Sequence, residues 1–255
     1  MGLGIGNGNA NLWTPISGGP VVPAYACKTL YSIDLDGLTE NGESALNTVP
    51  ILGAVGTGDF TIALWFKTPD TTGGAVNQKL LITQGSGTDW TIQLRGSDGK
   101  AQFTGPWTDV GNYVFTDNTW FHLAYSVDRS GLAKWVVNGV LQDTKNISAE
   151  TDVFTSAGTL YLGSNSSGNQ LFEGNFTEIS FWHASLSASN LLELYNNTEG
   201  KCYASDFSFS SDLKNYYPCF NPTGTFTNPL VDIVGASPIT LNNMNASNVS
   251  TDSPL

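Results

Sequence analysis

Hydrophobic and polar residues alternate along several short stretches of this chain. In segment 59–68, DFTIALWFKT, the two sets of alternating positions are Phe60, Ile62, Leu64 and Phe66, and Thr61, Ala63, Trp65 and Lys67. Successive side chains of a strand point to opposite faces, so this alternation predicts a strand whose first set of residues shares one face.

Similar stretches predict further strands, separated by turns that contain Gly-Ser, Asp-Gly or Asn-Gly. They cover residues 31–37, 79–85, 89–96, 100–105, 119–128, 132–144, 159–164 and 173–185. Within 132–144, the pair Asn138-Gly139 tolerates the positive φ that a type I′ turn requires, and this predicts a tight hairpin.

One helix is predicted in segment 186–200, LSASNLLELYNNTEG. Ser187 is a suitable N-cap, Leu191, Leu194 and Tyr195 fall on one stripe, and Gly200 is a stop signal. Short strands at roughly ten-residue spacing with one short helix predict an all-β Greek-key sandwich. We expect one large domain rather than two small ones.

The first 27 residues are rich in Gly, Pro and Asn and have little to bury by themselves. Two interpretations stay open. The segment is either a frayed terminus or an extended arm that orders against a neighbouring subunit, with Ile5, Trp13 and Ile16 as anchors.

Composition narrows the classes of partner. Only 13% of the 255 residues are charged, and the formal net charge is −12. Nucleic acid is a poor partner for this surface, because phosphate binding requires clustered Lys and Arg, and the 10 present are scattered. Calcium, a basic protein or an uncharged sugar is compatible with the charge, and solubility alone also explains it.

The cysteines, the N-terminus and the apolar stretches bear on zinc binding, export and membrane insertion. Cys27, Cys202 and Cys219 form no CxxC pair, so a zinc site is not expected. A disulfide between Cys202 and Cys219 is one possible bridge. The N-terminus has neither a basic region nor a continuous apolar run, so we expect no signal peptide. The sequence contains no stretch of 18 apolar residues, so we expect no membrane insertion.

Five separated motifs, in order, resemble the laminin-G-like jelly rolls of the concanavalin A-like lectin/glucanase superfamily. They occur within residues 29–200 and carry the residues Trp120, His122, Ala124, Asn138, Gly139, Gly163, Phe172, Gly174, Glu178, Leu186 and Ser187. Thr177-Glu178 departs from the pattern, where an Ile-Asp pair is usual. The resemblance implies a two-sheet antiparallel jelly-roll sandwich with one short helix, and it implies a structural role for His122.

The C-terminal part, residues 201–255, is similar to a segment of lectin-like structural proteins of marine bacteriophages. The likeness rests on Tyr217, Phe220, Asp232, Gly235, Leu241, Asn242 and Met244. We expect this segment to return to the jelly roll formed by residues 28–255, with residues 238–243, PITLNN, as an edge strand that tolerates Pro238 at its start.

Catalysis is not expected. Hydrolysis of a glycosidic bond requires two carboxylates that face one cleft, and the E-x-D-x-x-E pattern of the superfamily's glucanases does not occur. Glu173 and Glu178 have an odd spacing and so point to opposite faces of a regular strand. Asp34 and Asp36 share a face, but without a third acid. No Gly-x-Ser-x-Gly motif accompanies His122 or His183, so a nucleophilic triad is not expected either.

Binding of a cation or a sugar is the remaining chemistry. The resemblance makes calcium the candidate ion, and Asp89 and Asp109 lie in loops that could supply oxygen ligands, although both are also ordinary turn residues. For sugars, segment 105–118 concentrates Trp107, Asp109, Asn112 and Tyr113, and Trp90 is a further candidate. The alternative is that Trp107 covers the open end of the core.

The sequence therefore favours a virion structural protein of the decoration, fibre or appendage type. Its partners would be other virion proteins and further copies of itself, assembled through the arm, with host glycans as a further ligand. The alternative is a secreted or cell-surface carbohydrate-binding module that depends on calcium, with an extracellular location.

Overall fold

The computed structural model describes residues 31–44, 57–85, 88–154, 158–196, 206–219 and 225–254. The proposed arm, with Ile5, Trp13 and Ile16, and the cysteines Cys27 and Cys202 lie outside these residues. Cys219 is described, and its thiol is buried and free.

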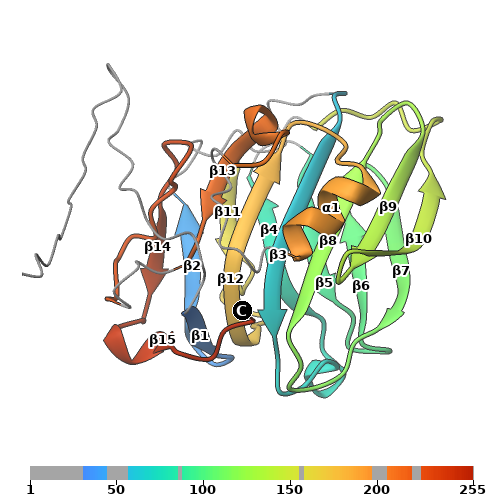
Figure 1. The fold of residues 1–255 in the computed structure, drawn as a ribbon. Coiled ribbons are helices and arrows are strands. Elements are labelled where there is room, and N and C mark those ends of the chain that lie inside the picture. The colour runs from blue at the N-terminus through green and yellow to red at the C-terminus, as the bar shows by residue number, and fades with distance from the viewer. Residues whose placement is uncertain are drawn as a thin grey trace, which may run out of the picture.

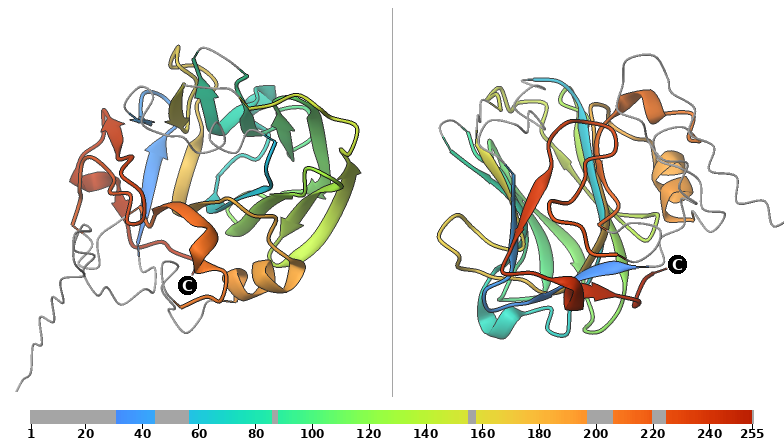
Figure 2. Two further views of the ribbon diagram at one scale, coloured as in Figure 1. Left: turned by 90° about the horizontal axis from the view of Figure 1, so that it is seen from above. Right: turned by 90° about the vertical axis from the view of Figure 1, so that its left-hand side faces the viewer.

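Two antiparallel sheets form the described part of the molecule (Figures 1 and 2). The strands of the first sheet, which we call the front sheet, are β10 (Val140–Asn146), β9 (Leu132–Val137), β8 (Phe121–Val127), β3 (Phe60–Lys67), β12 (Glu173–Trp182), β1 (Ser32–Asp36) and β15 (Val249–Ser250), in this order, with β13 (Leu213–Tyr217) also paired to β12. The strands of the back sheet are β14 (Ile239–Asn242), β2 (Asn41–Ser44), β11 (Thr159–Leu162), β4 (Gln78–Gln84), β5 (Thr91–Leu94), β6 (Lys100–Thr104) and β7 (Thr108–Val114), in this order. The predicted jelly-roll sandwich is confirmed.

The alternation in the sequence places side chains on the two faces of β3 as predicted. Phe60, Ile62, Leu64 and Phe66 belong to the core between the sheets. Ala63 belongs to a second cluster on the outer face of the front sheet. Thr61, Ala63 and Trp65 of the second set are also buried, because a helix and a C-terminal segment cover part of that outer face, whereas Lys67 at the end of the strand stays partly exposed.

The covering helix is α1 (Ala188–Tyr195), with Ser187 as its N-cap. The Ser187 hydroxyl accepts a hydrogen bond from Asn190 N, and this supplies a partner for one of the free N–H groups at the helix start. Leu191 and Leu194 are buried against the sheet. The described part of the chain also contains three short 3₁₀ helices, at Gly73–Ala75, Ser210–Asp212 and Ala246–Asn248. No helix of the described residues is long and apolar enough to cross a membrane.

The hairpin between β9 and β10 turns at the predicted pair. Asn138 and Gly139 have φ values of 50° and 72°, the combination that a type I′ turn requires. A Cβ atom on Gly139 would also lie 2.7 Å from Leu192 Cδ1, so the turn allows α1 to approach closely.

The C-terminal segment pairs with strands from distant parts of the chain. β13 pairs with β12, β14 pairs with β2, and β15 pairs with β1. The expected strand at 238–243 is β14, which lies at the edge of the back sheet. In this segment Asp232 accepts hydrogen bonds from the backbone of Tyr216, Val234 and Gly235, so Asp232 and Gly235 stabilise a turn.

Four strands were not predicted as such: β2, β7, β13 and β15. β7 occupies the middle half of the segment 105–118, which was expected to be a sugar-binding loop. It pairs with β6, and alternate residues, including Asp109 and Gly111, are buried. Asp and Gly at inward positions conceal the apolar alternation by which a strand is recognised.

Candidate functional site

The two tryptophans predicted to stack on sugars are core residues. Trp90 and Trp107 are only 1% and 4% exposed. Trp107 packs against Phe103 and Phe154, and its Nε1 donates a hydrogen bond to Tyr125 Oη at 2.8 Å. The expectation that these two rings face solvent was wrong. Trp107 packs within the core, in agreement with the alternative that it serves the core rather than a sugar.

The other residues of the predicted sugar site do not share one surface. Asp109 is buried and accepts a hydrogen bond from Tyr125 Oη at 3.1 Å, and burial raises the pKa of its carboxyl. Asn112 is exposed, on the opposite face of β7. Tyr113 is half-buried and packs edge-on against Phe115 and Phe121.

The predicted calcium ligands have separate surroundings. Asp109 faces the interior, and Asp89 is half-buried directly before the buried Trp90. Among the described residues, no group of three or more His, Cys, Asp or Glu side chains could hold a metal ion. Calcium binding by Asp89 and Asp109 stays a prediction from the sequence.

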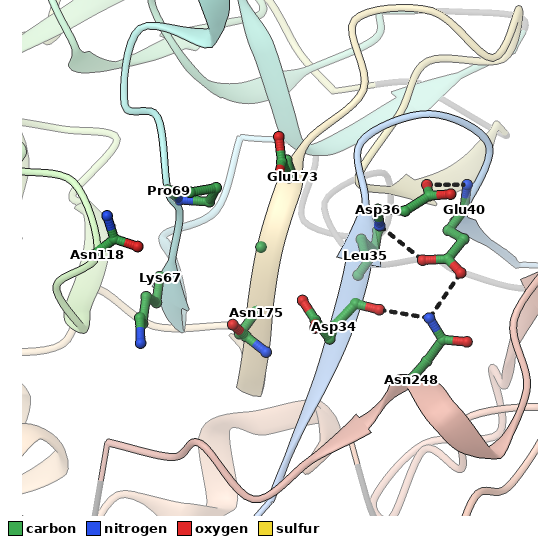
Figure 3. A pocket seen from close by; sticks show the side chains of 11 residues that line it. Asp34, Leu35, Asp36, Glu40, Lys67, Pro69, Asn118, Glu173, Asn175 and Asn248 are labelled. Carbon is green, nitrogen blue, oxygen red and sulfur yellow. Dashed lines mark hydrogen bonds between the residues drawn. The ribbon is translucent and has the colours of Figure 1, made fainter.

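A pocket of about 360 Å³ opens on the outer face of the front sheet (Figure 3). It lies at the ends of β3, β12 and β1 that α1 does not cover (Figure 1). Figure 3 shows the strand β12, with Glu173 and Asn175, between two groups of side chains. On one side lie Lys67, Pro69 and Asn118, and on the other lie Asp34, Asp36, Glu40 and Asn248.

The register of the strands brings these side chains together. Asp34 lies opposite Asn175, and Asp36 lies opposite Glu173, across the β1–β12 pair. Asn175 in turn lies opposite Lys67 on β3. The polar outward positions of three neighbouring strands therefore form one surface. Glu173 is the third acid that the sequence interpretation did not find, because it comes from the neighbouring strand.

Some of the acids are held by the protein itself. One carboxylate oxygen of Asp36 accepts hydrogen bonds from the backbone N–H groups of Leu38 and Thr39, and these bonds lower its pKa. Glu40 accepts from Asp36 N and from Asn248 Nδ2. These two side chains fix the turn after β1.

Asp34 and Glu173 differ from these two acids. No described residue donates a hydrogen bond to either carboxylate. Burial raises the pKa of Asp34, and the negative charges of Glu40, Asp252 and Glu173 raise it further. Both carboxylates are therefore free to bind a ligand in the pocket.

Beside the pocket, Lys67 forms an ion pair with Asp252. The second carboxylate oxygen of Asp252 accepts a hydrogen bond from Trp120 Nε1 at 2.8 Å. The Trp120 ring is partly exposed. It was noted in the sequence only as a motif residue, and its position is set by the C-terminal segment.

The covered part of the same sheet face contains two buried titratable side chains. Glu178 lies in a β-bulge of β12 with φ 54°, and it accepts a hydrogen bond from Tyr216 Oη. Burial raises its pKa to about 8. His122 is fully buried beside Trp65, neither ring nitrogen has a hydrogen-bond partner among the described residues, and burial lowers its pKa to about 3.

Two packed antiparallel sheets with one helix on an outer face define a lectin-like jelly roll. The sequence also matches a laminin G family model described as the concanavalin A-like lectin/glucanases superfamily, over residues 41–191, which is more than half of the chain. The chain belongs to this family. No curated protein matches the sequence.

Solved structures share the fold at low sequence identity. A proposed carbohydrate-binding protein from Bacteroides ovatus has a TM-score of 0.65 and 17% identity, with 89% of this chain and 62% of that chain covered. This chain thus corresponds to less than two thirds of that protein. A heptameric SAP-like pentraxin from Limulus polyphemus has a TM-score of 0.51 and 12% identity, with 67% of this chain and 83% of that chain covered.

Domain 4 of AbnA, an extracellular GH43 arabinanase from Geobacillus stearothermophilus, was solved in complex with arabinotriose. It has a TM-score of 0.50 and 21% identity, with 65% of this chain and 76% of that chain covered. At these identities the likenesses show the fold alone.

Proposed function

We propose that this protein is a non-catalytic, lectin-like carbohydrate-binding domain, and that its ligand site is the pocket on the outer face of the front sheet. The observation that carries the proposal is the pair of carboxylates, Asp34 and Glu173, that line this pocket without a donor among the described residues. Sugar hydroxyls are donors that carboxylates accept well.

The dimensions of the pocket agree with a small polar ligand. Its volume of about 360 Å³ lies at the lower end of the roughly 300–1,000 Å³ that is typical of ligand pockets. Asn118 and Asn175 add amide groups to the lining. Trp120, held by Asp252, supplies a partly exposed aromatic ring beside it. Carboxylates, amides and a neighbouring ring together suit one or two sugar units.

Binding without catalysis is proposed on the arrangement of the acids. A glycosidase requires an acid and a nucleophile or base on either side of the scissile bond. Asp36 and Glu40 are occupied by backbone and amide donors of their own turn. Asp34 and Glu173 lie on neighbouring strands along the floor of the pocket, where they suit contact with one side of a ligand.

A glycan array followed by calorimetry tests the proposal. The variant Asp34→Asn/Glu173→Gln keeps the shape of the pocket and removes both free carboxylates. We expect it to lose at least about tenfold in affinity for glycans that the unaltered protein binds, since it loses hydrogen bonds to charged acceptors. Asp152→Asn is the matched control, because Asp152 lies near Arg129 and Asp59, at the opposite end of β3 from Lys67.

Two results decide the matter. Equal affinity in the double variant and in the control would place the sugar elsewhere, and no binding to any glycan by the folded protein would refute the carbohydrate proposal. Incubation of each bound oligosaccharide with the protein, followed by chromatography, should leave it intact. Release of shorter products would contradict the non-catalytic assignment.

A more specific proposal is that this carbohydrate-binding domain is displayed on a virion. It rests on the resemblance of residues 201–255 to bacteriophage structural proteins that was inferred from the sequence alone, and an extracellular module is the alternative. Mass spectrometry of purified particles from the source should detect the protein if it belongs to a virion. Its absence from the particles would leave the extracellular alternative.

A further inference from the structure

The pocket has an excess of negative charge. The described residues of its lining include four carboxylates, those of Asp34, Asp36, Glu40 and Glu173, and one cation, Lys67. A ligand that enters a pocket with such a lining is selected for charge as well as for shape.

Lys67, the cation among the described lining residues, is neutralised by a carboxylate outside the lining. Lys67 Nζ forms an ion pair with Asp252, which Trp120 also holds by a hydrogen bond. The charge of Lys67 is therefore balanced without a contribution from Asp34 or Glu173. The rise in the pKa of Asp34, which its acidic neighbours increase, is the expected response to a negative local potential.

The floor of the pocket presents an uncharged acceptor between the carboxylates and Lys67. Asn175 is only 8% exposed, and its Nδ2 donates a hydrogen bond to Ser32 Oγ at 3.2 Å. Its Oδ1 has no partner among the described residues. Asn175 lies opposite Asp34 and two residues after Glu173 on β12, so the three side chains share one face.

Three such acceptors match a particular donor group. A protonated amine carries one positive charge and three N–H donors, whereas a neutral sugar hydroxyl carries one donor and no charge. A bare metal ion is a poorer match, because the pocket exceeds the size of an ion and no described cluster of His, Cys, Asp or Glu could hold one.

We propose that this pocket selects amino sugars, whose protonated amine binds among Asp34, Glu173 and Asn175 Oδ1, over their neutral N-acetylated counterparts. The inference rests on the proposed carbohydrate-binding function and names its ligand class. Asp34 and Glu173 supply the charge, and Asn175 supplies a fixed acceptor that orients the amine.

The test compares the disaccharide of glucosamine with the disaccharide of N-acetylglucosamine by calorimetry near pH 6, at low salt and at about 0.5 M salt. We expect the amino sugar to bind at least about tenfold more tightly at low salt, as for one additional charge contact. We expect its affinity to fall with salt, because the contact is partly solvent-exposed, and the weaker binding of the neutral sugar to change little.

Variants separate the pocket from the net charge of the protein. Asp34→Asn/Glu173→Gln should remove the preference for the amino sugar. Asp152→Asn removes one negative charge at the other end of β3 and should keep the preference. A linear diamine of the same charge should bind at least about tenfold more weakly than the amino sugar, because it lacks the ring hydroxyls.

Three outcomes would overturn the inference. They are equal affinity for the two disaccharides, a preference that persists in the double variant, and diamine binding as tight as that of the amino sugar. If only the neutral disaccharide binds and the double variant abolishes this binding, the ligand class is wrong and the proposed function stands. If neither disaccharide nor any array glycan binds to the folded protein, both proposals fail.

Discussion

The outer face of the front sheet has two halves that are built from the same strands. In the covered half, α1 and residues 206–219 pack on small or apolar side chains such as Ala63 of β3 and Trp182 of β12. In the open half, the other ends of these strands carry Lys67, Glu173 and Asn175 around the pocket. A change of residue type along one strand face thus converts an interior surface into a candidate binding surface.

The two halves also treat ionisable groups differently. The covered half contains Glu178 and His122, and burial favours the neutral form of each. The open half keeps Asp34 and Glu173 accessible to a ligand. We therefore expect substitutions in the covered half to change stability, and substitutions in the open half to change binding.

The largest expected effect is that of Trp182→Ala. Trp182 is fully buried in the cluster under α1, and its ring lies 5.3 Å from that of Phe209. We expect a loss of about 3–5 kcal/mol in the free energy of unfolding, because the substitution leaves a cavity. Urea denaturation measures it. Leu192→Ala on the exposed side of α1 is the control and should cost less than about 1 kcal/mol.

Glu178→Gln should stabilise the protein at alkaline pH. The folded-state pKa of Glu178, about 8, lies above its ordinary value of 4.5. Between these values only the unfolded chain is ionised, so the free energy of unfolding falls as pH rises through the window. Glutamine keeps an acceptor for Tyr216 Oη, and we expect a gain on the order of 2–4 kcal/mol at pH 8.

Denaturation of both proteins from pH 4 to pH 9 checks this prediction. The two stabilities should converge at pH 4, where the carboxyl is protonated in both states. A constant difference across the range would mean that packing, rather than ionisation, distinguishes the variant.

His122→Phe should give a smaller gain, on the order of 1–3 kcal/mol, since it removes two buried nitrogens without partners. The folded-state pKa of His122 is about 3, below the ordinary 6.5, so only the unfolded chain takes up the proton between these values. The stability of the unaltered protein should therefore fall as pH falls from 6.5 to 3. Thermal denaturation should show a shallower acid dependence in His122→Phe and in His122→Leu. An acid dependence as steep in both variants as in the unaltered protein would contradict the assignment to His122.

The smallest expected effect on stability is that of Asp34→Asn and Glu173→Gln. Both carboxylates are free of hydrogen bonds from described residues, so each substitution should change the free energy of unfolding by no more than about 0.5 kcal/mol. Urea denaturation of the two single variants measures this. A loss above about 2 kcal/mol would show that the open half is part of the structural framework.

The sequence predicted what depends on local spacing. The alternation in β3 gave both of its faces, Asn138-Gly139 gave the hairpin turn, and Ser187 gave the N-cap. Each of these signals acts over a few residues. A four-residue strand such as β2, NGES, has no apolar alternation, and tertiary pairing alone makes it a strand.

The pocket depends on register between distant strands, which the sequence does not state. Asp36 and Glu173 are separated by more than a hundred residues, and only the β1–β12 pairing makes them neighbours. The prediction that the rings of Trp90 and Trp107 stack on sugars failed for a different reason. A tryptophan near a turn looks the same in sequence whether its ring covers the core or faces solvent.

The strand β1 has a consequence for the order of events during synthesis. It enters the front sheet between β12 and β15, and Ser32 Oγ donates a hydrogen bond to the backbone oxygen of Asp252. A ribosome therefore releases Asp34 long before it has made Glu173, Asn248 or Asp252. Since such distant pairings form slowly and late, the pocket cannot exist in a nascent chain that ends before Asp252, and ligand binding would report a molecule translated through this residue and folded.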